Sequence, residues 1–399
     1  MKTVLNNIKG DKVIWAVVFL LSIFSVLAVY SSTGTLAYRY QSGNTEYYLI
    51  KHLGILLLGF VLMFIAHMIK YKYYARISQL ALFISVPLLA YTLMFGTNVN
   101  EASRWYTLPL INLTFQPSDF AKLALIIYVA RLLAKKQNVI DDFRRGFLPI
   151  ILPVFLITAL ILPANFSTAA MIFITCLVLM FIGRVRFRYI LALVGLGIVS
   201  MVLLLVVLAY SPKLGGRIGT WQNRIENFRS DDSEGNYQVE QAKIAIANGG
   251  ITGKMPGNST QKNFLPHPYS DFIFAIIIEE YGLIGGTIVV LLYLVLFFRS
   301  IKIVIHSPRN FAAFLTFGVT FSLVFQAMIN MMVAVNIIPV TGQTLPLISM
   351  GGTSIWFTSI SIGIILSVSR EIEEEQEKVK EKESKQKSKK EEAPEYVIA

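Results

Sequence analysis

Residues 13–30 read VIWAVVFLLSIFSVLAVY, an uncharged apolar run that follows Lys9 and Lys12. A helix that crosses a bilayer needs about 20 mostly apolar residues. The run is long for the apolar segment of a signal peptide, and further runs of the same kind follow it along the chain. We therefore interpret it as the first, retained helix of a membrane protein.

The rest of the chain repeats this pattern. Only 15% of the 399 residues are charged, whereas a soluble domain carries about 25%. We expect an all-α, polytopic integral membrane protein over residues 1–369, with a long loop at 211–270 between its seventh and eighth helices. Within this loop, residues 237–248 are predicted to form a short helix that stops at Gly249-Gly250. The ten predicted transmembrane helices are residues 13–31, 49–69, 76–95, 117–134, 147–163, 168–183, 188–210, 271–298, 310–336 and 352–369.

Loop charges predict the orientation of the chain in the membrane. Starting with the N-terminal segment, every second connection carries several Lys and Arg residues, for example 70–76 and 135–145. The short connections between them hold one cation or none, with Arg39 in the first and Arg104 in the second. Because cations gather in cytoplasmic loops, both termini are predicted to be cytoplasmic and the loop 211–270 to be extracytoplasmic.

Composition excludes several other kinds of protein. We attribute the net charge of +12 to cytoplasmic loops that face anionic lipid, and not to nucleic-acid binding. The single cysteine, Cys176, excludes an intramolecular disulfide, and the four histidines lack metal-ligand spacing. Residues 370–399 are rich in Glu and Lys, and we expect this cytoplasmic tail to be disordered or only transiently helical.

Ionisable groups within membrane spans mark functional sites by default. In the fourth span, Asp119 and Lys122 follow Pro117 in the first helical turn, and their i, i+3 spacing lets them meet on one face. They are candidates for substrate binding. The alternative is a structural ion pair that keeps both charges near lipid.

The eighth span carries three further carboxylates. Asp271 lies where the long loop returns to the membrane, and Glu279 and Glu280 follow roughly 12 Å deeper, at about 1.5 Å per residue. The alternatives are an N-terminal helix cap for Asp271 and buried hydrogen-bonding partners for the two glutamates.

Residues 344–354, TLPLISMGGTS, combine a proline with small residues between the last two spans. Tight packing at a re-entrant turn explains this segment better than direct chemistry. With the orientation set, all these segments lie on the extracytoplasmic side, together with Arg104, Lys254 and Lys262. The sequence therefore predicts a polar cavity at the outer leaflet that offers both cations and carboxylates.

At these residues the chain resembles the SEDS family (shape, elongation, division and sporulation), from the first span to the tenth. The Gly257–Lys262 element is more typical of the FtsW branch than of RodA, which favours septal over lateral-wall synthesis. The family motifs QPSE-x-x-K, YQ through GNS-x-QK, DFIF and TLPLIS-x-GG correspond to Gln116–Lys122, Tyr237–Lys262, Asp271–Phe274 and Thr344–Ser354.

A few positions depart from the family pattern. None of them is Asp271, so the resemblance still implies activity, but it leaves in doubt a metal-binding role for the loop's usual Glu or His. The departures are Asp119 for Glu, His267 and Tyr269 for Glu and His, Met350 at a usually aromatic position, and Asn165 where Asp is common.

The resemblance implies a peptidoglycan glycosyltransferase that polymerises lipid II in the bacterial inner membrane. Asp271 would be the general base, and the α-linked donor and β-linked product imply a single inverting displacement. A divalent cation, Mg²⁺ or Mn²⁺, could assist, and no organic cofactor is expected. The substrate-binding candidates are Arg104, Lys122, Asp119, Lys254, Lys262, Glu279 and Glu280.

The family also implies a class B penicillin-binding protein and other division proteins as partners. Two other readings stay open. A lipid II flippase should need polar groups through the whole membrane depth, and a non-catalytic scaffold for a transpeptidase would not need Asp271.

Overall fold

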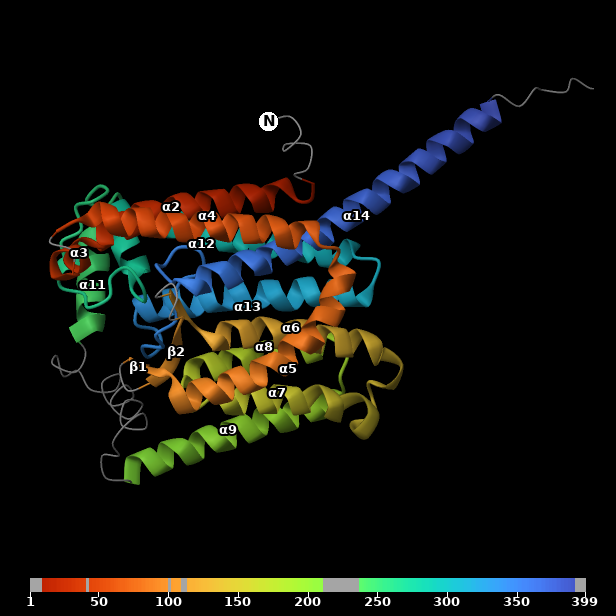
Figure 1. Cartoon of the computed structure of the whole chain (residues 1–399), viewed down its shortest axis with the longest axis horizontal. Helices are drawn as coiled ribbons and strands as arrows, with labels where there is room; N and C mark the ends of the chain where they lie inside the picture. The colour runs from red at the N-terminus through yellow and green to blue at the C-terminus, as the bar shows by residue number, and fades with distance from the viewer. Residues whose placement is uncertain (1–8, 41–42, 100–101, 109–112, 211–236, 392–399) are drawn as a thin grey trace, which may run out of the picture.

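The computed structural model describes residues 9–40, 43–99, 102–108, 113–210 and 237–391. Each predicted span overlaps one long helix of this part of the chain, and the helices run side by side in one bundle (Figure 1). These helices are α2 (Lys12–Ser32), α4 (Thr45–Met68), α5 (Tyr71–Phe95), α6 (Pro117–Lys135), α7 (Leu148–Ile161), α8 (Phe166–Ile182), α9 (Phe187–Tyr210), α12 (Ile273–His306), α13 (Asn310–Ala334) and α14 (Thr353–Glu391).

The predicted multi-pass membrane architecture is confirmed. Seven helical segments of the described chain are long and apolar enough to cross a bilayer. Helix α8 and the Phe187–Leu203 part of α9 are apolar but shorter than that, and α6 carries the charges of Asp119, Lys122 and Arg131. The count of ten spans therefore stays a prediction.

Apolar side chains cover the outside of the bundle as well as its core. Leu57 of α4, Phe83 of α5 and Leu203 of α9 are all more than half exposed. A helix that is apolar on all sides suits a lipid environment, since a soluble protein would hide at least one such face. Inside the bundle, α14 lies along α4, and α13 contacts both α6 and α12.

The two ends of the bundle differ in structure (Figure 1). At one end the first turn of α2 lies near the projecting part of α14. At the other end, called the α11 end below, short elements gather. They are α3 (Gly34–Tyr40), β1 (Thr97–Val99), β2 (Ala102–Leu108), β3 (Leu113–Phe115), the 3-10 turn Gln261–Asn263 and α11 (Tyr237–Gly249). The 3-10 turn Gln137–Val139 and the π-helical turn Phe143–Phe147 connect α6 to α7 at the opposite end.

The connection between α5 and α6 and the long loop between α9 and α12 both contain regular secondary structure at the α11 end. Residues between α5 and α6 form an antiparallel sheet in the order β1-β2-β3, with Tyr106 paired to Phe115. In the long loop, residues 211–236 lie outside the described residues. The predicted short helix is confirmed as α11, and Gly250 follows it with a φ of +53°, the left-handed turn that a glycine permits.

In the tail, α14 continues as a helix to Glu391, and the predicted disorder or transient helicity of residues 370–399 stays a prediction. Glu, Lys and Gln are good helix formers, and a Glu placed four residues before a Lys, as in Glu374 and Lys378, adds support. The N-terminal segment also fastens the first turns of this tail. Glu373 accepts a hydrogen bond from the Gly10 amide at 2.7 Å, and Ser369 accepts one from the Asp11 amide at 3.0 Å.

Candidate active site

A polar cavity of about 210 Å³ lies at the α11 end, where α6 and α12 begin and α13 ends. Its walls come from six separate parts of the chain, so only the folded bundle assembles it. Two carboxylates, those of Asp119 and Asp271, line this cavity. The lining residues are Gln116, Asp119, Asn165, His267, Tyr269, Ser270, Asp271, Gln326, Gly342, Gln343, Thr344 and Ser354.

Asp271 sits in a tight turn just before α12. The helix cap is Phe272, which makes no side-chain capping bond, so the reading of Asp271 as a helix cap is wrong. The carboxylate is half-buried at the cavity wall, and the Ser270 hydroxyl donates a hydrogen bond to its Oδ1 at 2.9 Å. A carboxylate that reaches solvent or substrate through a cavity can exchange protons with a bound hydroxyl.

Side chains from neighbouring helices hold the segment after α13 in place. Its backbone is irregular, and irregular backbone at membrane depth requires partners from the surrounding protein. Gln326 donates to the Thr344 carbonyl at 3.0 Å, and Tyr293 donates to the Pro346 carbonyl. Ser25 of α2 donates to the Ile348 carbonyl at 2.9 Å. The predicted tight packing of residues 344–354 is therefore confirmed.

Asp119 and Lys122 pair as the spacing predicted, with 3.7 Å between Oδ1 and Nζ. The Lys122 ammonium also donates to Gln326 Oε1 at 2.8 Å. Lys122 lines a small pocket of about 10 Å³ beside the cavity, whereas Asp119 lines both. The pair thus meets the cavity through Asp119, and the ammonium is engaged in contacts within the protein.

Glu279 lies in a different cluster, away from the cavity lining. It is fully buried, and its carboxylate accepts hydrogen bonds from the Thr260 and Gln261 amides, both at 3.2 Å. The Ser259 hydroxyl donates at 2.5 Å and the Lys254 ammonium at 3.1 Å. These contacts match the alternative reading of Glu279 as a buried hydrogen-bonding partner.

Glu280 belongs to the same cluster. Its carboxylate accepts a hydrogen bond from the Ser31 hydroxyl of α2 and a longer one, at 3.4 Å, from the Ser259 amide. Lys262 donates to the Gly257 carbonyl at 2.6 Å instead of to a glutamate. Neither glutamate nor either lysine of this loop lines the 210 Å³ cavity. Their substrate-binding role stays a prediction.

The loop that carries Lys254 and Lys262 also forms backbone hydrogen bonds at a break in α12. Gly282 has non-helical angles, φ +68° and ψ −172°, and an added Cβ would lie 2.1 Å from the Ile251 carbonyl oxygen. The Lys254 amide donates to the Glu279 carbonyl at 2.9 Å, and the Leu283 amide donates to the Gly250 carbonyl at 3.0 Å. The loop thus satisfies backbone groups that the helix break leaves open.

Arg104 is placed only by its backbone, which lies in β2 at the α11 end. Its side chain is outside the described set, so its predicted phosphate contact stays a prediction. The divalent cation expected from the family resemblance also stays a prediction. No group of three or more His, Cys, Asp or Glu residues suited to a metal occurs in the part of the chain that the structure describes.

Two amide side chains of α13 that line or support this cavity were not predicted from the sequence. Gln326 lines the cavity, and Asn330, 1% exposed, bonds to the backbone of two wall residues. Both are polar residues within a predicted apolar span, and that departure was the available signal.

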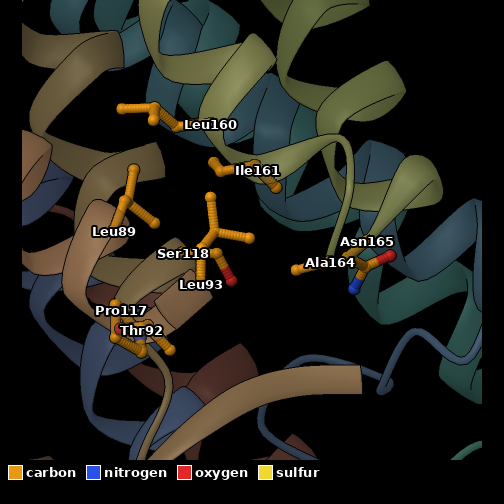
Figure 2. A pocket seen from close by; sticks show the side chains of 9 residues that line it. All are labelled: Leu89, Thr92, Leu93, Pro117, Ser118, Leu160, Ile161, Ala164 and Asn165. Atoms are coloured by element: carbon orange, nitrogen blue, oxygen red, sulfur yellow. The ribbon is translucent and has the colours of Figure 1, made fainter. Parts of the chain in front are cut away.

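An apolar pocket adjoins the polar cavity and shares Asn165 with it. Figure 2 shows Leu89 and Leu160 around one side of this pocket and Ser118 and Asn165 nearer the other. Its volume is about 20 Å³, which is close to the space of one water molecule. It is therefore too small in this structure to take a substrate group.

Comparison with known proteins places this geometry in a family. The family model of FtsW, RodA and SpoVE, described as cell cycle protein, matches residues 11–374. Stage V sporulation protein E of Bacillus subtilis is 33% identical over 90% of this chain and 97% of its own length. A probable peptidoglycan glycosyltransferase FtsW of Geobacter sulfurreducens is 32% identical over 91% of this chain and 95% of its own.

Solved structures agree on the fold. A chain from the study "Structural coordination of polymerization and crosslinking by a peptidoglycan synthase complex" superposes with a TM-score of 0.72 and 24% identity, covering 91% of this chain and 98% of that one. The rod shape determining protein RodA of Thermus thermophilus gives a TM-score of 0.63 at 24% identity, covering 90% and 97%.

Proposed function

Because the chain belongs to the FtsW, RodA and SpoVE family of cell cycle proteins, we propose that it is a peptidoglycan glycosyltransferase that polymerises lipid II. The observation that carries the proposal is the polar cavity with Asp271 in its wall. A glycosyltransferase needs a base near the acceptor sugar and a closed polar space around the reacting groups.

Asp271 acts as the general base in this proposal. Its carboxylate takes the proton from the acceptor sugar hydroxyl as the oxygen attacks the anomeric carbon of the donor. The bond from that carbon to the undecaprenyl pyrophosphate breaks in the same step, and the leaving group carries away the electron pair. One displacement inverts an α-linked donor to a β-linked product.

Negative charge that grows on the pyrophosphate must be neutralised. Arg104 of β2 is the proposed direct partner, and the cations Lys254 and Lys262 are secondary candidates. Lys122 acts behind the wall, by its 3.7 Å contact with Asp119. A divalent cation would fit if the substrate supplied most of the oxygens, because Mg²⁺ commonly uses one or two carboxylates together with substrate phosphates. Asp119 and Asp271 are the carboxylates of the cavity that could serve.

The proposal includes a placement in the cell. Ten spans with cytoplasmic termini put the cavity at the outer face of the inner membrane, and the alternation of basic and cation-poor loops supports this orientation. The FtsW-named relatives and the Gly257–Lys262 element favour septal synthesis during division over elongation. A class B penicillin-binding protein and other division proteins are the proposed partners.

The flippase reading is less favoured. A transport path should carry polar groups through the whole membrane depth. Here the polar cavity lies at one end of the bundle, and the two deeper glutamates are occupied by contacts within the protein.

The deciding experiment reconstitutes the purified protein with a class B penicillin-binding protein and lipid II. Glycan strands should form with the wild type and disappear with Asp271→Ala. Strands that persist in that variant would refute the base assignment. If no strands form while labelled lipid II crosses liposome membranes, the flippase reading replaces the polymerase. Strand yield with and without EDTA tests the cation.

A further inference from the structure

The turn that carries Asp271 is held by its backbone. Three consecutive carbonyl groups, those of Tyr269, Ser270 and Asp271, each accept a hydrogen bond from a residue far away in sequence. The donors are the Met350 amide at 2.9 Å, the Ser349 hydroxyl at 2.7 Å and the Asn330 amide group at 2.8 Å. No residue of the turn itself supplies these three contacts.

The two side-chain donors are buried and tie the turn to other parts of the site. Asn330 uses the same amide nitrogen to donate to the Gln343 carbonyl at 2.7 Å, so one side chain bridges two walls of the cavity. The Ser349 hydroxyl also accepts from the Leu345 amide at 2.8 Å. Asn330 and Ser349 are each 1% exposed, so both hydrogen bonds are shielded from bulk solvent.

We propose that Asn330 and Ser349 are positioning residues for Asp271. They fix the peptide groups at 270 and 271 and thereby the direction in which the Asp271 carboxylate leaves the backbone. This role rests on the proposed function, in which Asp271 is the base. Neither residue touches the substrate in this scheme, and both act through the backbone of the turn.

The three hydrogen bonds to the carbonyls of residues 269–271 are called the clamp below. The position of Asp271 explains why the turn needs them. Asp271 precedes the first residue of α12 by two positions, so the regular hydrogen bonds of the helix do not fix it. A general base must lie within hydrogen-bond reach of the proton it takes, and a displacement of about 1 Å can cost on the order of 100-fold in rate. The clamp replaces the constraint that a helix would otherwise give.

Ser349 provides the graded test. Ser349→Ala removes the donor, and Ser349→Cys keeps nearly the same shape with a weaker one. The matched control is Ser22→Ala on α2, which also removes a buried serine hydroxyl bonded to a carbonyl, that of Val18 at 2.8 Å. Asn330→Ala removes the second donor.

Three measurements separate positioning from general destabilisation. Reconstituted lipid II polymerisation gives kcat and KM, the thermal midpoint reports stability, and hydrogen exchange reports the amides of residues 269–276. We expect kcat to fall about 10-fold for Ser349→Ala and between about 10- and 100-fold for Asn330→Ala, with KM within twofold. Ser349→Cys should lie between wild type and Ser349→Ala, and residues 269–276 should exchange faster than in Ser22→Ala.

The outcomes are distinguishable from failure of the proposed function. If the wild type makes no glycan, the polymerase proposal fails, and the exchange rates still test the clamp. If the wild type is active while Ser349→Ala and Asn330→Ala match Ser22→Ala in both kcat and exchange, the clamp is refuted. A loss of kcat that follows the thermal midpoint in all variants, Ser22→Ala included, refutes it as well.

Discussion

Asp271 and Glu279 lie eight positions apart on the same stretch of chain, and the bundle gives them opposite environments. Asp271 is half-buried in the wall of a 210 Å³ cavity. Glu279 is fully buried, and four residues donate hydrogen bonds to its carboxylate. Two carboxylates with the same chemistry in water therefore differ in what they can do here.

The contrast lies in where each carboxylate's surroundings direct their hydrogen bonds. Around Asp271 the hydrogen bonds from distant residues go to the backbone of the turn, and the neighbouring Ser270 hydroxyl donates to the carboxylate at the cavity wall. Around Glu279 it directs amides, hydroxyls and an ammonium at the carboxylate itself. A buried charge persists only when such partners compensate for its lost hydration. Four predictions test this contrast.

The largest effect is expected for Asp271→Asn. The amide keeps the shape of the side chain but cannot accept the sugar proton, so polymerisation should fall by about 10²- to 10⁴-fold. The thermal midpoint in detergent should stay within a few degrees of wild type. A variant that retains more than a tenth of the wild-type kcat would show that another group is the base.

Glu279→Gln should act on stability instead. The new NH₂ group would face amide and hydroxyl donors, and Lys254 would lose its ion pair, at a cost of about 3 kcal/mol in the free energy of unfolding. Chemical unfolding in micelles, compared with the wild type, measures this loss. If kcat or KM changes while stability does not, the prediction of substrate binding by Glu279 gains support and the contrast breaks.

Gly282→Ala should weaken the fastening of the long loop. The residue has φ +68°, and its new Cβ would meet the Ile251 carbonyl oxygen at 2.1 Å, so we expect a loss of about 2 kcal/mol. Gly195→Ala on α9 is the matched control, because nothing lies within 4 Å of its Cβ position. The control should leave the unfolding midpoint unchanged or slightly raised. Equal midpoints for the two variants would contradict the strained contact.

The smallest effect is a coupling energy between Asp119 and Lys122. Lys122→Met leaves a buried aspartate without its cation, and adding Asp119→Asn removes that charge. The double variant should therefore be more stable than Lys122→Met alone, with a coupling of about 1–2 kcal/mol in a double-mutant cycle. Strictly additive effects would show that the 3.7 Å pair carries no structural energy.

Several features of the site could be predicted from the sequence because they depend on local spacing. The i, i+3 pair of Asp119 and Lys122 forms, and Gly249 and Gly250 end α11. Asp271 also lies where the chain returns to the bundle. The residues that hold it were not predicted, because the partners of its turn lie about 60 and 80 positions away, at Asn330 and Ser349.

The tail that follows the last predicted span depends on its tertiary context. Its composition argued against ordered structure, yet residues 370–391 continue α14, with Glu371 accepting the Tyr71 amide at 2.9 Å. A helix that starts inside a packed bundle avoids the cost of nucleation, so a charged extension can remain helical where an isolated peptide would not.

Apolar length and local spacing are properties of the chain, so the class of this protein, its membrane helices and its family could be predicted without the structure. Which carboxylate reaches a cavity and which one fastens a loop depends on tertiary contacts. Burial and hydrogen-bond partners come from residues distant in sequence, and no local pattern records them. Asp271 and Glu279 are alike in the sequence, and the bundle around them places one at a cavity wall and the other in a buried cluster of hydrogen-bond donors.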